Sequence, residues 1–335
     1  MKSRPGTLLR VPALNCFGGE PMLKYFLRKL LLALPVLLGI TIIDFLIMNC
    51  AGSPLDMMTG PRMTAATKAS LAARLGLDRP LWQQYLSWLH EILHGNLGYA
   101  YKSNQPVLEL IMSHLSPTLL LMGVSLIVGL ALAVPLGVYS AVHRYEKQDY
   151  ALVSLSFLTS SIPGFFLSML LIYFFTVRLG WLPSGGMVTA GTGGGFLDRL
   201  RHLIMPVLVL SIPIAASNMR YIRSSVLEIL ETDYMRTATV KGIGHRLVIW
   251  RHGMRNALLP IVTVIGMQIP GLFGGAVIVE KIFNWPGLGL LTMDAVMTRN
   301  YPLIMGICLL SAVVVLLCNL LTDLIYGLVD PTIRY

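Results

Sequence analysis

Apolar residues fill six long runs of the chain, and polar residues gather between them. The runs cover residues 30–48, 117–142, 150–177, 203–219, 257–279 and 301–322. A helix needs roughly 20 apolar residues to cross the hydrocarbon core of a bilayer, because each backbone polar group must find its partner inside the helix there. The pattern therefore predicts an all-α integral membrane protein with about six transmembrane helices.

Few residues inside these runs are polar or break helices. Prolines inside the runs include Pro135, Pro163, Pro213 and Pro270. Neighbouring helices in a membrane bundle absorb the kinks that such prolines cause. Asp44 and Asp323 stand near the ends of runs, where an aspartate reaches the interface or bonds to a neighbouring helix. No further acidic residue lies inside the runs, which disfavours the proton relay of an ion-coupled secondary transporter.

The overall composition agrees with a bilayer as solvent. Of the 335 residues, 55% are apolar and 13% are charged, well below the roughly 25% charged residues of an ordinary soluble domain. The net charge of +10 is the excess of 26 Lys and Arg residues over 16 Asp and Glu residues, and the basic residues lie between the runs and not on one basic face. Nucleic acid is therefore not an expected partner. The four cysteines have no metal-site spacing.

Basic residues between the runs indicate how the chain is oriented. Lys and Arg concentrate in cytoplasmic loops. Seven of them fall within residues 220–255, whereas five are spread over residues 50–116. We therefore expect both termini to be cytoplasmic. Residues 22–115 would then hold the first transmembrane helix and an extracytoplasmic segment, and residues 116–335 a five-helix core.

The first 21 residues are neither apolar nor patterned. They precede the sequence Met22-Leu23-Lys24, which is an ordinary start for a membrane protein. We therefore expect translation to begin at Met22, with residues 1–21 as an upstream extension.

Residues 90–94 spell His-Glu-Ile-Leu-His, the HExxH pattern that places two zinc ligands on one face of a helix. Residues 81–93 are predicted to be helical, and His114 or Glu109 is a candidate third ligand. The favoured alternative is an amphipathic helix in which His90 and His94 are incidental and Gly95 ends the helix. Its expected buried stripe is Trp82, Tyr85, Trp88, Leu89 and Ile92. We expect no metal site, and a membrane-anchored metalloprotease is kept only as an alternative.

A nucleotide site is not predicted in this chain. The glycine-rich residues 191–195 lie in an expected outer loop and are followed by Asp198 instead of a lysine. The dipeptide Gly-Lys occurs nowhere, so the G-x-x-x-x-G-K-[ST] phosphate loop is absent from the sequence. The chain is expected not to be an enzyme, and any ATP-driven work must come from a partner.

Residues 220–255 form a connection much longer than a hairpin between two helices requires. Two helix-capable segments, 234–240 and 245–256, are separated by Gly242 and Gly244. The small side chains near this break are Thr237, Ala238 and Gly242, and the basic ones are Arg236 and Lys241. Small residues allow close approach to a partner, and the basic ones suit acidic groups. Docking to a protein and contact with anionic lipid both fit this pattern.

Residues 231–242 (ETDYMRTATVKG) and 250–260 (WRHGMRNALLP) resemble the ATPase-docking loop of permease subunits from binding-protein-dependent ABC importers. The similarity is strongest to the oligopeptide, dipeptide and nickel branch. Further matching motifs are 75–98, 274–280 (GGAVIVE), 283–289 (FNWPGLG), 301–302 and 330–335 (DPTIRY). Two departures are Arg236-Thr237-Ala238 in place of Glu-Ala-Ala, and Asn96 in place of an aspartate.

The resemblance implies an importer-permease helical bundle in the bacterial cytoplasmic (inner) membrane, with a cytoplasmic coupling helix. Its partners would be a homologous second permease, two ATPase subunits that bind ATP and Mg²⁺, an extracytoplasmic binding protein and membrane lipid. No cofactor would sit in this chain. The implied ATPase-coupling residues are Asp233, Tyr234, Arg236, Thr237, Ala238, Lys241 and Gly242. The implied function is import of short peptides by alternating access, with nickel or metallophores as the alternative substrate.

Overall fold

The computed structural model describes residues 22–52, 55, 65–74, 76–191, 193–232 and 276–329. Within these ranges every extended regular element is helical, and a single isolated β-bridge joins Tyr99 to Pro106. The helices are α1 (Met22–Cys50), α3 (Ala65–Arg74), α4 (Leu81–Leu93), α5 (Val107–Val142), α6 (Lys147–Ser161), α7 (Gly164–Leu171), the π-helix η1 (Ile172–Arg178), α8 (Phe196–Leu230), α12 (Leu288–Met297) and α13 (Tyr301–Val329).

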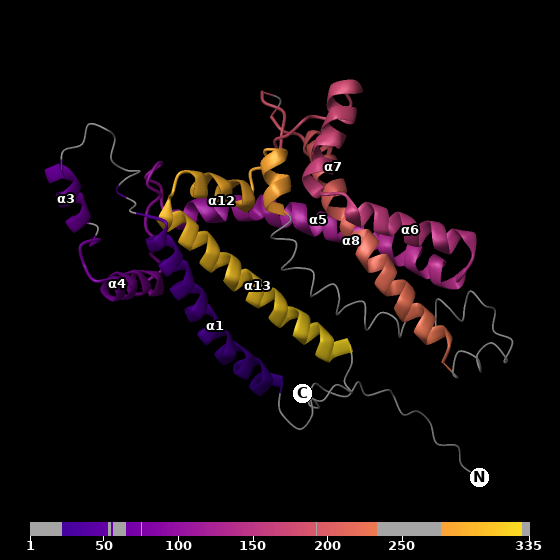
Figure 1. Ribbon diagram of the computed structural model, residues 1–335, viewed down its shortest axis with the longest axis horizontal. Helices are drawn as coiled ribbons and strands as arrows, with labels where there is room; N and C mark the ends of the chain where they lie inside the picture. The colour runs from indigo at the N-terminus through magenta and orange to yellow at the C-terminus, as the bar shows by residue number, and fades with distance from the viewer. Residues whose placement is uncertain are drawn as a thin grey trace, which may run out of the picture.

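The long helices form two packed groups (Figure 1). Helices α1 and α13 run side by side, while α5, α6 and α8 pack together. The two groups meet at one end, where α13 and α12 contact α5 and the Trp285 indole, just before α12, donates to the Pro117 carbonyl of α5 at 3.0 Å. At the same end the Tyr301 hydroxyl of α13 donates to the Gly52 carbonyl, just after α1, at 3.0 Å. We call this the α12 end. The α5–α6 turn, residues 143–146, meets the last residues of α8 at the opposite end.

Two glycines allow α5 and α8 to approach closely. A Cβ atom added at Gly137 would lie 2.8 Å from the Met219 carbonyl oxygen and 2.9 Å from Ile222. A Cβ atom added at Gly129 would likewise lie 2.6 Å from the nearest side-chain atom of Ile214. Real Cβ contacts are not this short, so the helix backbones touch where α5 presents glycine.

The described residues contain four helices that are long and apolar enough to cross a membrane, or up to five when the bent pair α6 and α7–η1 counts as one crossing. The run at 150–177 was expected to form one kinked helix, and that expectation is wrong. The axis turns by 94° between Ser161 and Gly164. Pro163 explains the break, because proline has no N–H to donate and disfavours helical conformation at the residue before it.

Helix α8 is longer than its apolar run predicts. It continues from Phe196 to Leu230 and contains Pro206 and Pro213, whereas the run covers 203–219. The apolar run marks only the segment of α8 that is hydrophobic enough to lie in lipid. The helix itself extends beyond that segment at both ends, because no glycine interrupts it. Residues 220–230, expected to open the docking loop, therefore belong to α8. Most of the expected crossing at 257–279 lies outside the described residues, and residues 276–279 are helical.

The two aspartates near run ends differ in their surroundings. Asp323 accepts a hydrogen bond from the Lys29 ammonium at 2.8 Å, which joins α13 to α1 and confirms the expected bond to a neighbouring helix. Oδ2 of Asp44 is buried and has no hydrogen-bond partner among the described residues.

Candidate functional site

The expected ATPase-coupling residues all lie outside the described residues. They are Asp233, Tyr234, Arg236, Thr237, Ala238, Lys241 and Gly242. The structure does describe the end of α8 that leads to them, up to Thr232, and the side chains that hold this end in place. This part of the molecule is the first candidate site.

A buried carboxylate ties three segments together beside the end of α8. Asp149, in the first turn of α6, is 2% exposed. Arg223 of α8 donates to it from Nε at 2.7 Å and from Nη2 at 2.6 Å. The Ser140 hydroxyl of α5 donates at 2.5 Å, and the Tyr145 backbone N–H of the α5–α6 turn donates at 3.0 Å. A bidentate arginine fixes the carboxylate in geometry as well as in charge.

A second charged link lies at the surface nearby. Arg144 of the α5–α6 turn donates to the Glu231 carboxylate at 2.5 Å, directly after the last residue of α8. These side chains are 39% and 64% exposed, so water screens the pair. Both links join the region of the α5–α6 turn and the start of α6 to the last part of α8, one through a buried pair and one through an exposed pair.

The α12 end carries a second buried carboxylate. Glu280 is fully buried and accepts hydrogen bonds from the Thr118 hydroxyl at 2.7 Å and from the backbone N–H groups of Gly289 at 2.6 Å and Leu290 at 3.2 Å. These two N–H groups lie in the first turn of α12, which has no side-chain cap from Gly287. A carboxylate at a helix N-terminus satisfies such donors and interacts well with the helix dipole.

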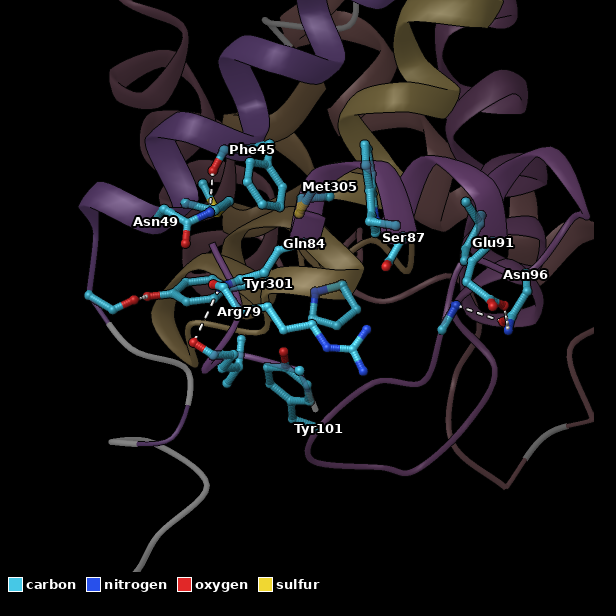
Figure 2. Close-up of a pocket in the computed structure, with 18 residues that line it drawn as sticks. Phe45, Asn49, Arg79, Gln84, Ser87, Glu91, Asn96, Tyr101, Tyr301 and Met305 are labelled. Atoms are coloured by element: carbon cyan, nitrogen blue, oxygen red, sulfur yellow. Dashed lines mark hydrogen bonds between the residues drawn. The ribbon is translucent and has the colours of Figure 1, made fainter. Parts of the chain in front are cut away.

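A pocket of about 420 Å³ lies beside this end, between α1, α4 and α13. Figure 2 shows its lining, with Phe45 and Met305 as apolar walls and Glu91 held by the Asn96 amide at 2.7 Å. Tyr101 also lines it, and burial, followed by the nearby Tyr301 hydroxyl, raises the pKa of Tyr101 to about 12. The volume lies at the small end of the range for ligand pockets, roughly 300–1,000 Å³.

Helix α4 has the bounds that its sequence predicts, and Gly95 follows its end with a positive φ. Tyr85 and Trp88 pack against Phe45 of α1, with ring centroids 5.5 and 6.4 Å apart. The stripe is less buried than expected: no residue of α4 is fully buried, and Trp82 is 62% exposed. Helix α4 meets α1 along one side only, which leaves its first turn uncovered.

The rings of the HExxH histidines lie tilted against each other, with centroids 4.4 Å apart and planes at 52°, and Nδ1 of His94 lies 2.8 Å from the His90 carbonyl oxygen. The described residues contain no group of three or more His, Cys, Asp or Glu side chains that could hold a metal ion. We expect the purified chain to contain far less than one zinc per molecule and His90→Ala with His94→Ala to leave transport unchanged. Zinc at one atom per chain, lost in that double variant, would overturn this expectation.

Sequence reasoning missed Asp149, Arg223 and Glu280 as members of buried clusters. Asp149 directly precedes the apolar run at 150–177, and Arg223 lies four residues after the run at 203–219. Charges at these borders usually face water, so no pattern in one sequence marks them as partners. Glu280 appears only as the last residue of a matching motif.

Comparisons with known proteins agree with this fold. The family model described as binding-protein-dependent transport system inner membrane component matches residues 133–335, and the model of its N-terminal part matches residues 22–122. In the solved inward-facing MetNI methionine ABC transporter, one chain superposes with a TM-score of 0.56 at 20% identity, covering 67% of this chain and 97% of that one. This likeness shows the fold.

Curated relatives match along nearly the whole chain. The oligopeptide transport system permease protein AppB of Bacillus subtilis is 44% identical over 94% of this chain and 100% of its own length. The dipeptide transport system permease protein DppB of Escherichia coli K12 is 40% identical, with 94% and 99% covered. The glutathione transport system permease protein GsiC of Salmonella choleraesuis is 39% identical, with 94% and 100% covered. The chain therefore belongs to the family of binding-protein-dependent transport system inner membrane components, as a multi-pass permease subunit.

Proposed function

We propose that this chain is one transmembrane subunit of an ATP-driven importer of short peptides. The observation that carries the proposal is the near-complete coverage of relatives whose names specify oligopeptide, dipeptide and glutathione transport. Separate ATPase subunits would bind ATP and Mg²⁺ and hydrolyse the nucleotide, since the sequence has no phosphate loop of its own. A homologous second permease would complete the path through the membrane.

In this proposal the ATPases act on residues 233–242, which directly follow Thr232, two residues after the end of α8. Asp233, Tyr234, Arg236, Thr237, Ala238, Lys241 and Gly242 would form the contact. ATP binding would close the ATPases and move this segment. The permease would then pass between states open to one side or the other, as in other alternating-access systems.

The basic residues within 220–255 support placing this segment in the cytoplasm, together with both termini. The α12 end, with α4 and the pocket beside it, would then face outward. We propose that this end meets the extracytoplasmic binding protein. Deleting residues 60–75 should then weaken binding-protein affinity and peptide uptake.

The replacement Ala238→Arg tests the docking assignment. A large charged side chain at a close contact costs roughly 1–3 kcal/mol, which corresponds to about 5- to 150-fold weaker association. We therefore expect the variant to insert into the membrane normally but to lose co-purifying ATPase subunits and peptide uptake. Ala66→Arg, the same change at an exposed position of α3, serves as the matched control for membrane insertion and ATPase co-purification. Normal ATPase binding and uptake in Ala238→Arg would refute the assignment.

A further inference from the structure

The buried carboxylate of Asp149 has more hydrogen-bond donors around it than simple helix packing requires. One carboxylate accepts four hydrogen bonds, and the donors come from α5, the α5–α6 turn and α8. Asp149 is almost completely buried, whereas the Arg223 side chain is 22% exposed. Taking a carboxylate out of water is costly, and these four donors compensate that cost only in this arrangement.

The same network holds together the last turn of α5, the first turn of α6 and the last part of α8. Gly137 already places α5 in backbone contact with α8 near Met219 and Ile222. Arg223 directly follows this contact, two helical turns before α8 ends at Leu230. A displacement of the end of α8 therefore reaches α5 by close packing, and it reaches α6 both by packing and through the charged pair at Asp149.

Helix α6 does not continue into α7 as one straight helix, because the axis turns by 94° at Pro163. Apart from Asp149, the described hydrogen bonds between α6 and α8 are those from Arg220 to Ser156 and Ser160, at 3.2–3.3 Å. These are longer than the two bonds from Arg223 and do not reach a carboxylate. The bidentate pair is therefore the strongest polar connection between these helices.

We propose that Asp149 is a positioning residue for energy coupling, which makes α6 follow α8 when the ATPases move the segment after Thr232. The inference rests on the proposed function for its source of motion. In the wild type, α6 and α8 move together. Without the Asp149 charge, α8 still moves but α6 lags behind, so that ATP hydrolysis continues while transport per ATP falls.

The test uses the complete complex in proteoliposomes, with the chain carrying Asp149→Asn. Asparagine keeps the shape and can still accept from Ser140, but it lacks the charge that holds Arg223. Arg144→Gln is the matched control, because it breaks the exposed link between the same segments. Uptake of a labelled dipeptide and ATP hydrolysis are measured in the same vesicles. We expect the ratio of peptide to ATP to fall at least about fivefold in Asp149→Asn, within the usual range for coupling between sites, and to stay near wild type in Arg144→Gln.

Distances between spin labels report the motion itself, without requiring transport. Labels are placed at exposed Tyr150 of α6, Tyr221 of α8 and Leu317 of α13, in a background without native cysteines. ATP should change both the α6–α13 and the α8–α13 distance in the wild type. In Asp149→Asn only the α8–α13 distance should change. Equal changes of both distances in the variant, with an unchanged peptide-to-ATP ratio, would overturn the proposal.

If Asp149→Asn fails to assemble, the neutral pair Asp149→Asn with Arg223→Gln replaces it, because it leaves no buried charge without a partner. The neutral pair should show the same loss of coupling, and a wild-type ratio there would overturn the proposal. A wild-type complex that hydrolyses ATP but imports no dipeptide would refute the proposed function instead. The label distances would then still decide whether Asp149 links α6 to α8.

Discussion

The replacement Glu280→Ala is expected to destabilise the permease by about 3 kcal/mol or more. It removes the acceptor for two buried donors, the Thr118 hydroxyl and the Gly289 backbone N–H, and for the partly buried backbone N–H of Leu290. A buried donor without a partner costs roughly 1–3 kcal/mol. The apparent Tm of the detergent-solubilised chain should therefore fall by about 5 °C or more.

Asp294→Asn is the control for this prediction. Asp294 is also a carboxylate near the α12 end, where it accepts from the Lys281 ammonium at 2.9 Å, but both side chains are about half exposed. An exposed pair of this kind contributes roughly 0–1 kcal/mol. Comparable stability of Glu280→Ala and Asp294→Asn would contradict the view that Glu280 organises the start of α12. Glu280→Gln, which keeps one acceptor oxygen, should lie between the two.

The replacement Gly137→Ala should also be strongly destabilising, although it adds only one methyl group. That methyl would lie 2.8 Å from the Met219 carbonyl oxygen and 2.9 Å from Ile222, so α5 and α8 must separate. Inserting a carbon into a closely packed contact costs roughly 1–3 kcal/mol. Thermal unfolding of the purified chain measures the effect.

Gly123→Ala, on the same helix, is expected not to destabilise the chain. A Cβ atom there meets nothing within 4 Å. Alanine is a better helix former than glycine by roughly 0.5–1 kcal/mol, so this variant should be as stable as the wild type or more stable. If both variants shift the apparent Tm in the same direction and by the same amount, the close approach of α5 and α8 at Gly137 is not what stabilises the pair.

The sequence predicts four of its six crossings as long apolar helices in the described residues, because lipid imposes one dominant requirement: apolar side chains on a helix whose backbone polar groups are bonded internally. Helix α4 was predictable for a different reason: Gly95 ends its aromatic-rich amphipathic pattern. The sharp turn at Pro163 was not predictable, because a proline in a membrane helix causes anything from a mild kink to a full break. Which occurs depends on the helices packed around it.

The buried clusters show where single-sequence reasoning stops. Asp149 and Arg223 stand 74 residues apart, and Thr118 and Glu280 stand 162 apart. Nothing local tells which charged residue at the border of a run will find a partner and which will face water. The resemblance to a family predicted the function and the coupling residues within 233–242. It did not predict the contacts of Asp149 and Arg223 that hold the last part of α8.

Uptake of a labelled dipeptide by the reconstituted complex tests the central claim most directly. The vesicles contain this chain, its second permease and the ATPase subunits, with ATP inside and the binding protein and dipeptide outside. We predict accumulation above the external concentration with ATP, and none with a non-hydrolysable ATP analogue. Accumulation driven by an ion gradient in vesicles without the ATPase subunits would contradict the claim that this chain is the permease of an ATP-driven peptide importer.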